Sequence, residues 1–394
     1  MLRSLFSGIS GLRSHQTMLD VTGNNIANVN TTGFKASQVQ FQDTLSQVVQ
    51  NAGGAQAGNG GTNPAQVGLG VKVAGITTNF TQGASQLTGR STDMMIQGDG
   101  FFMVRKGAET FYTRAGSFDF DATGQMVLPG EGALVQGWLA GPGGAIDTNG
   151  PVSDLSVPAG RLMEANASTE AVFGGNLKAD AAVGTSMERV VQLFDETGNQ
   201  RELALTFTKG AAGWTMSATD GTATYPTTPL VFDATTGALT SPTAFAVGAV
   251  TVDLSTVTGF AGVDTIAKKS QDGYAAGTLE SFALAADGTI TGSFSNGLKQ
   301  AIGKLAMGSF TNPAGLSKAG GSLYRTSVNS GDAQIGAAGT GGKGSLAGGA
   351  LEMSNVDLSS EFTNLIVAQR GFQANSRVIT TSDELLQELV NLKR

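Results

Sequence analysis

The side chains that most often perform catalysis or bind metals are scarce in this chain. His15 is the only histidine, and there is no cysteine. A catalytic triad or a histidine-based metal site would depend on His15 alone. Without cysteine the chain cannot form disulfides, thiolate zinc sites, iron–sulfur clusters or a thiol nucleophile. His15 lies one position away from the apolar spacing of its predicted helix, so we expect a solvated or interface side chain.

A glycine-rich run ending in Gly342-Lys343 resembles a phosphate-binding loop. Such a loop needs serine or threonine after the lysine, but Gly344 stands there, and Ala337 occupies the position of the leading glycine. The motif therefore departs from the requirement twice, and the run is interpreted as a linker.

Two clusters of acidic residues could suggest cation binding or acid–base catalysis. Asp119, Asp121 and Gly124 lack the 12-residue spacing and the closing glutamate of a calcium loop. Asp195 and Glu196 lie in a predicted turn, where solvated acids are common, and do not indicate glycosidase chemistry. The sequence thus predicts no enzyme, no cofactor and no metal site.

The composition favours a β-rich protein with many turns. Only 14% of the 394 residues are charged, and 57 are glycine. A net charge of −7 without dense clusters of Lys and Arg argues against binding nucleic acid. No apolar stretch reaches the 18 to 20 residues or so of a membrane-spanning helix. The amphipathic N-terminus does not resemble a cleaved signal peptide, so we expect neither membrane insertion nor signal cleavage.

Apolar residues recur with alternating steps of three and four at both ends of the chain, which is typical of a coiled-coil seam. Polar or small residues at the same spacing include Gln16, Gly23, Gln369, Ser376 and Asp383. The apolar positions, which we predict to form an assembly interface, are Leu2, Leu5, Ile9, Leu12, Leu19 and Ile26, then Leu358, Phe362, Leu365, Phe372, Ile379, Leu386 and Leu389.

Neither terminal helix could bury its apolar stripe alone, because a single amphipathic helix of 25 to 35 residues or so is marginal in water. Each stripe needs the other end of the chain or a neighbouring subunit. Gly371 inside the second helix costs about 1 kcal/mol relative to alanine. Its presence suggests either close approach of another backbone or local tolerance.

Between the helices, short apolar runs alternate with Asp-Gly and Thr-Gly turns, which predicts strands and hairpins. Examples are Phe101 to Val104, and the pair Val190 to Phe194 and Glu202 to Phe207 around the turn at 195–199. The fold class is therefore mainly β with α-helical termini, which pair as a coiled-coil-like layer around two nested β-domains. The expected boundaries are 1–34 and 354–394 for the helical layer, 35–67 and 336–353 for connectors, 68–145 and 276–335 for a β-domain, and 146–275 for an inserted outer β-domain.

Motifs near both termini resemble the signatures of bacterial flagellar rod and hook axial proteins. They are Asn24-Asn25-Ile26-Ala27-Asn28 with Thr32-Gly33-Phe34-Lys35, and Gln369-Arg370 with Phe372-Gln373-Ala374-Asn375-Ser376. The interior run Gly98-Asp99-Gly100-Phe101-Phe102 also matches the β-domain that these proteins share. The residues carrying the terminal signature are Asn24, Asn25, Asn28, Gly33, Phe34, Gln369, Arg370 and Asn375.

The inserted stretch resembles hook members of the family more than the shorter rod members. This resemblance implies a homopolymer forming a curved, flexible tube that transmits torque from rod to filament as a universal joint. It also implies contacts with the distal rod protein, the hook cap, the hook–filament junction proteins and the type III export apparatus, and an extracellular location. The alternatives are a distal rod protein with an insertion and, in another class, a secreted β-rich adhesin.

Overall fold

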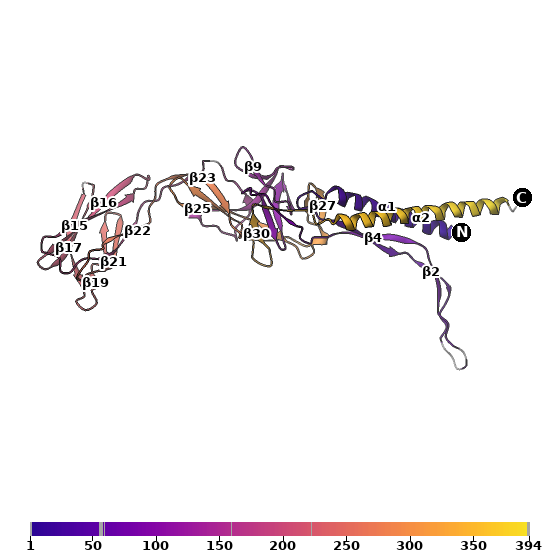
Figure 1. The fold of residues 1–394 in the computed structure, drawn as a ribbon, viewed down its shortest axis with the longest axis horizontal. Helices are drawn as coiled ribbons and strands as arrows, with labels where there is room; N and C mark the ends of the chain where they lie inside the picture. Colours follow the sequence, from indigo (N-terminus) through magenta and orange to yellow (C-terminus); the bar gives the residue numbers. More distant parts are fainter. Residues whose placement is uncertain (1, 55–57, 59, 159, 222, 392–394) are drawn as a thin grey trace. The chain divides into compact units, whose positions relative to one another are not determined.

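The computed structural model describes residues 2–54, 58, 60–158, 160–221 and 223–391 (Figure 1). The chain divides into two compact units. The first comprises Met1–Pro158, Ala283–Thr291 and Ala301–Arg394, and the second comprises Ala159–Phe282 and Gly292–Gln300. One unit is thus built from segments that flank the other in sequence.

The first unit contains two long helices, α1 (Leu2–Ala27) and α2 (Leu358–Asn391), which pack against each other as predicted. Helix α2 begins after Asp357, whose carboxylate accepts hydrogen bonds from the amides of Ser359 (2.9 Å) and Ser360 (3.3 Å). This N-cap satisfies amides that have no partner within the helix. The helix therefore begins later than the predicted boundary at 354.

The β-strands of the first unit surround a core of aromatic and aliphatic side chains. One sheet includes the order β25-β11-β7-β8-β28-β27. Its core contains Phe101, Met103, Tyr112, Trp138 and Tyr324. The strands are β1 (Ser37–Asp43), β2 (Ser46–Gln50), β3 (Ala65–Gly68), β4 (Val71–Thr78), β5 (Ser85–Leu87), β6 (Met94–Gln97), β7 (Phe101–Lys106), β8 (Glu109–Thr113), β9 (Asp119–Phe120), β10 (Met126–Leu128), β11 (Ala133–Leu139), β12 (Ser153–Asp154), β25 (Lys299–Leu305), β26 (Met307–Ser309), β27 (Ser317–Gly320), β28 (Leu323–Arg325), β29 (Gln334–Gly336), β30 (Ser345–Gly348) and β31 (Ala350–Glu352). Two single-turn 3-10 helices span Pro142–Gly144 and Pro313–Gly315.

The segments expected to be connectors contain paired strands. β1 pairs with β4, and β2 pairs with β3, both antiparallel. At the other end, β30 pairs with β6 and β31 with β5. The prediction of connectors at 35–67 and 336–353 is therefore wrong for these strands. They form by backbone pairing with distant segments, which leaves little periodicity in glycine- and glutamine-rich sequence.

The second unit is a pair of sheets enclosing its own hydrophobic core. One sheet has the order β20-β21-β14-β22 and the other β15-β16-β17-β18-β19. Phe173, Phe207, Trp214 and Leu254 are among its buried residues. The strands are β13 (Leu162–Met163), β14 (Glu170–Asn176), β15 (Ser186–Phe194), β16 (Gln200–Gly210), β17 (Gly213–Asp220), β18 (Ala223–Phe232), β19 (Leu239–Ser241), β20 (Ala244–Val247), β21 (Val250–Thr258) and β22 (Ala267–Gln271). The strands β23 (Gly277–Leu284) and β24 (Thr289–Phe294), like β25, contain residues of both units.

The limits of the second unit differ from the expected insertion at 146–275. β12 pairs with β11, which keeps residues up to Pro158 in the first unit. At the base of the insertion, Asn166 and Tyr274 exchange two backbone hydrogen bonds of 3.0 and 2.9 Å. The chain thus enters and leaves the distal part of the second unit at adjacent positions.

The predicted hairpin at 190–207 is confirmed, with Phe194 opposite Gln200 across the turn. The Asp195 carboxylate accepts hydrogen bonds from the Thr197 hydroxyl (2.8 Å) and from the amides of Thr197 (2.9 Å) and Asn199 (2.8 Å). The Thr197 hydroxyl is the largest cause lowering the pKa of Asp195 to about 2. Because this pKa is lower than in the unfolded chain, the carboxylate stabilises the turn above pH 4 or so, and its contribution is lost as the pH falls towards 2. Asp121 forms the same pattern with Thr123 and Gln125, so Asp121 and Asp195 both lie in turns, while Asp119 lies in β9.

Candidate assembly interface

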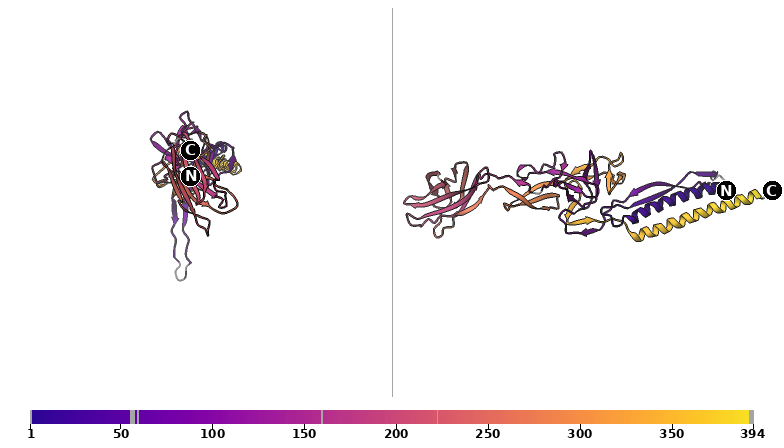
Figure 2. Two further views of the ribbon diagram at one scale, coloured as in Figure 1. Left: turned by 90° about the vertical axis from the view of Figure 1, so that its left-hand side faces the viewer. Right: turned by 90° about the horizontal axis from the view of Figure 1, so that it is seen from above.

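Helices α1 and α2 run antiparallel in close contact. Near one end, the side-chain amide of Asn25 donates to the Glu361 carboxylate at 3.0 Å. In the middle, the His15 ring lies against Gly371, and further along Gly8 lies against Ile379. Figure 2 shows the two helices side by side in a view from above.

The surface between the two helices consists largely of small and polar residues. In α1, Gly8, Gly11, Ser14, Thr22 and Asn25 are buried. Among the described side chains of α2, those of Ala368 and Ser382 are buried. Small side chains allow the helix backbones to approach closely, as at Gly11, where a Cβ atom would lie 2.6 Å from the Asn375 side-chain oxygen.

The predicted apolar seam lies one position away from this contact. Phe362 and Leu358 are 52% and 39% exposed, and most other members are only half-buried. The helices pair as predicted, and their contact centres on the neighbouring set of residues, although the seam residue Ile379 also lies against Gly8. The half-buried members are Leu5, Ile9, Leu12, Leu19, Ile26, Leu365, Phe372, Ile379 and Leu386, and the side chains of Leu2 and Leu389 lie outside the described part.

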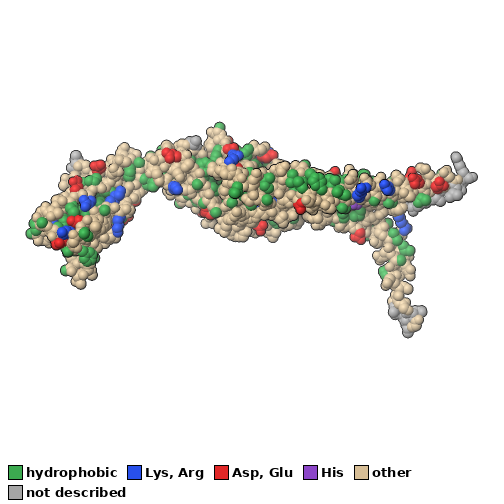
Figure 3. Space-filling model, in the orientation of Figure 1, with side chains coloured by type: hydrophobic (Ala, Val, Ile, Leu, Met, Phe, Trp, Pro, Cys, Tyr) green, Lys and Arg blue, Asp and Glu red, His purple; other side chains and the backbone are tan. Residues whose placement is uncertain are grey.

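Further exposed apolar residues widen this stripe along the helices. Ile366 is 55% exposed and Val367 53%. Figure 3 shows hydrophobic side chains gathered over part of the helical segment. Exposed apolar patches are typical of surfaces that bind another molecule, so this stripe is a candidate assembly surface. The use of the seam residues in assembly remains a prediction.

The close approach at Gly371 leads to a testable expectation. A Cβ atom there would lie 2.5 Å from Cε1 and Nε2 of His15, whose ring also packs edge-on to Phe41. Gly371→Ala should therefore destabilise the helix pair, although alanine favours helix by about 1 kcal/mol. Gly23→Ala is the matched control, since a Cβ atom there meets nothing within 4 Å.

Thermal unfolding followed by circular dichroism at 222 nm or so would compare the two variants. We expect Gly371→Ala to melt below the unmodified protein and Gly23→Ala at or above it. If both substitutions raised the melting temperature equally, the contact with His15 would not limit which side chain fits at position 371.

Several signature residues fix the junction where the helices meet the β-domain. The Asn25 side chain donates to the carbonyl of Ser37 (2.8 Å) and accepts from its amide (3.0 Å). Gly33 has a left-handed φ of 67°, and a Cβ atom there would lie 2.4 Å from the amide nitrogen of Ala115. Only glycine fits this conformation and this contact. These residues therefore set how α1 leaves the β-domain.

A buried ionic cluster completes the junction. Lys35 Nζ lies 2.6 Å from Glu352 Oε1 and 2.7 Å from the carbonyl oxygen of Thr81. Arg114 Nη1 lies 3.5 Å from the other carboxylate oxygen of Glu352. Burial lowers the pKa of Lys35, and the hydrogen bond that Lys35 donates to Glu352 opposes that shift. The cluster joins three segments that are distant in sequence. Sequence motifs do not predict it, although Lys35 ends one of the signature motifs.

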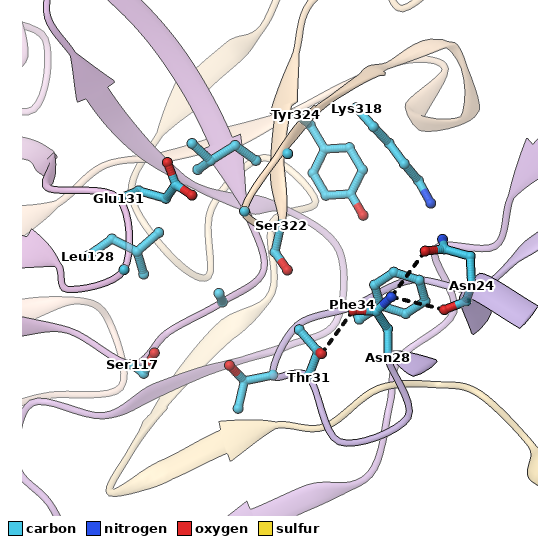
Figure 4. Close-up of a pocket in the computed structure, with 16 residues that line it drawn as sticks. Asn24, Asn28, Thr31, Phe34, Ser117, Leu128, Glu131, Lys318, Ser322 and Tyr324 are labelled. Carbon is cyan, nitrogen blue, oxygen red and sulfur yellow. Dashed lines mark hydrogen bonds between the residues drawn. The ribbon is translucent and has the colours of Figure 1, made fainter. Parts of the chain in front are cut away.

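Other signature residues line a cavity of about 460 Å³ beside the junction, which we call the junction pocket. Asn24, Asn28 and Phe34 form one side, with Leu128 opposite (Figure 4), and Leu323 also lines the pocket. The Asn28 side chain donates to the carbonyl and side-chain oxygens of Asn24 at 2.9 and 3.2 Å. The pocket thus combines an apolar floor with a polar rim.

The remaining signature residues are distributed differently. The Asn375 side chain donates to the carbonyl of Gly371 (2.8 Å) and lies against Gly11. Gln369 and Arg370 are exposed on α2, away from the contact with α1. Signature residues therefore lie both inside the subunit, at the junction and the helix contact, and on the exposed surface of α2.

The described residues include no group of three or more His, Cys, Asp or Glu side chains placed to hold a metal ion. Within the same part of the chain, neither long helix has the length and hydropathy needed to cross a membrane.

Comparison with known proteins agrees with this architecture. Three family models match: "Flagella basal body rod protein" over residues 5–35, "Flagellar hook protein FlgE/F/G D1 domain" over 95–169, and "Flagellar basal body rod FlgEFG protein C-terminal" over 347–392. The matched segments coincide with α1 and the junction, part of the β-domain, and α2.

Proteins that match over their full length identify the family more specifically. The chain is 40% identical to the flagellar hook protein FlgE of Borreliella burgdorferi, covering 100% of both chains. It is 36% identical to the flagellar basal-body rod protein FlgG of Bacillus subtilis, again over 100% of both. The crystal structure of Helicobacter pylori flagellar hook protein FlgE2 shares the fold, with a TM-score of 0.54 at 14% identity over 66% of this chain and 98% of that one. The paired terminal helices, the nested β-units and these full-length matches establish that the chain belongs to the flagellar hook protein FlgE family of flagellar structural proteins.

Proposed function

We propose that this chain polymerises into the curved, flexible tube of a flagellar hook, which transmits torque from the rod to the filament as a universal joint. The observation that carries the proposal is the apolar stripe left exposed on paired terminal helices, in a family of hook subunits. Identical subunits that meet through two different surfaces grow into a helical filament when the contacts do not close into a ring.

The same proposal includes the route and the partners that the family implies. The subunit would pass through the flagellar type III export apparatus without signal cleavage and assemble outside the cell. It would contact the distal rod protein at one end, the cap during growth, and the hook–filament junction proteins at the other end. A helix pair whose buried residues are largely small and polar supports this route, because it buries little apolar surface that export would have to expose.

A distal rod protein is the second candidate, favoured by the 36% identity to a FlgG protein. Electron microscopy of basal bodies from cells lacking the gene separates the candidates. Complete rods without hooks would support the hook subunit, and truncated rods would support the rod protein. Intact flagella would contradict both.

We expect the second unit to provide the flexing outer layer. Deleting residues 167–273 removes most of it at the point where Asn166 and Tyr274 already pair. The shortened subunit should still form tubes through its helices, but the tubes should be straighter or stiffer than those of the full chain. Curvature and persistence length measured by electron microscopy test this, and unchanged values would show that bending arises elsewhere.

A further inference from the structure

Helix α2 extends beyond the described start of α1. The contacts match Asn25 with Glu361, His15 with Gly371 and Gly8 with Ile379. Continuing this antiparallel pairing residue by residue brings Leu2 beside Glu384. Leu385–Asn391 therefore extends about 10 Å further, at 1.5 Å per residue, and we call this segment the α2 extension. Both Figure 1 and Figure 2 show α2 passing the start of α1.

The α2 extension displays apolar side chains that its own chain leaves uncovered. Leu385 is 52% exposed and Val390 is 69% exposed. A small hollow between Leu386, Gln387, Val390 and Asn391 lies on the same segment. A helix end with this much exposed aliphatic surface needs a partner surface to be stable in water.

The junction pocket lies at the opposite end of the helix pair and is suited to an aliphatic occupant. Phe34, Leu128 and Leu323 supply apolar walls, and about 460 Å³ accommodates two or three such side chains. Figure 4 shows Phe34 and Leu128 on either side of an open space.

The charged groups of the pocket are already engaged. Lys318 Nζ donates to the Ser37 hydroxyl at 2.8 Å and lies 5.1 Å from the centre of the Phe34 ring. The Glu131 carboxylate lies 2.6 Å from Lys106 Nζ. An apolar side chain in the pocket would therefore leave both charged groups with their present partners. A buried charge without a partner would otherwise oppose binding.

We propose that the α2 extension of one copy docks in the junction pocket of the next copy along the polymer. The two surfaces differ and lie at opposite ends of the same helical layer, so the contact repeats head to tail without closing. It continues the apolar helix stripe from one subunit to the next. This inference rests on the proposed function, because it requires a homopolymer.

A cysteine pair tests the contact, since the chain has no cysteine of its own. Val390→Cys combined with Ser117→Cys places one thiol on the α2 extension and one in the pocket. Within a single chain these positions are separated by most of the length of α2, about 50 Å, far beyond the reach of a disulfide. Any disulfide between them therefore joins two copies.

The matched control combines Val390→Cys with Val328→Cys, a fully exposed residue outside the pocket. In oxidised tubes we expect a ladder of cross-linked multimers from the Ser117 pair, at about tenfold the yield of the control pair. A second pair, Gln387→Cys with Gly130→Cys, tests the same contact if the first variant does not assemble.

The outcomes separate this proposal from the proposed function. Tubes that form without cross-linking above the control, in the pairs that assemble, would overturn the docking and leave the hook assignment intact. Failure of the unmodified chain to form any polymer would overturn both. Equal cross-linking of the control and pocket pairs would show that the extension does not select the pocket.

Discussion

Glu352→Ala should lower the free energy of unfolding of the first unit by about 3 to 5 kcal/mol. The Glu352 side chain is fully buried and lies between Lys35 and Arg114. Removing it leaves two buried cations without this counterion, although Lys35 keeps the carbonyl of Thr81 and Arg114 keeps the carbonyl of Gly98 and the Phe101 ring. A buried charge without a partner is much more costly than a lost surface ion pair.

Urea unfolding monitored by tryptophan fluorescence measures this effect. In a Trp214→Phe background, Trp138 is the remaining tryptophan and reports on the first unit. The control is Glu109→Ala, which removes an exposed ion pair with Arg325 and should change the free energy of unfolding by at most about 1 kcal/mol. A loss for Glu352→Ala no larger than the control would show that the cluster does not hold the junction together.

Phe362→Asp should abolish tube formation while leaving the isolated subunit almost as stable as before. The ring is 52% exposed in the single chain, so little internal packing is lost. In a polymer that covers the stripe, the new carboxylate would be buried without a partner in every subunit, and the cost repeats at each contact. Leu12→Asp and Leu365→Asp, at half-buried seam positions, should also prevent assembly.

Sedimentation of polymerised protein, together with thermal unfolding of the subunit, tests this expectation. Thr363→Asp introduces the same charge at the next position, outside the apolar spacing, and should assemble more readily. Tubes in normal yield from Phe362→Asp would show that the stripe is not part of the polymer contact.

Periodicity and turn chemistry revealed the main elements in advance because they are local. The steps of three and four identify α1 and α2, since residues at that spacing share one face of a helix. The turn at Asp195 is equally local, because the carboxylate bonds to residues two and four positions later. The terminal motifs pointed to the flagellar axial family for the same reason, as they are contiguous strings.

Only the tertiary structure decided which of two adjacent helix faces forms the contact within one chain. The apolar series and the series of small residues have the same spacing and differ by one position, so periodicity alone cannot separate them. Close backbone approach at Gly8, Gly11 and Gly371 selects the small face for the contact within one chain, and the use of the apolar face by other subunits is our proposal. Likewise, Lys35, Arg114 and Glu352 are far apart in sequence. Their cluster forms only because the fold brings three distant segments together at one buried site.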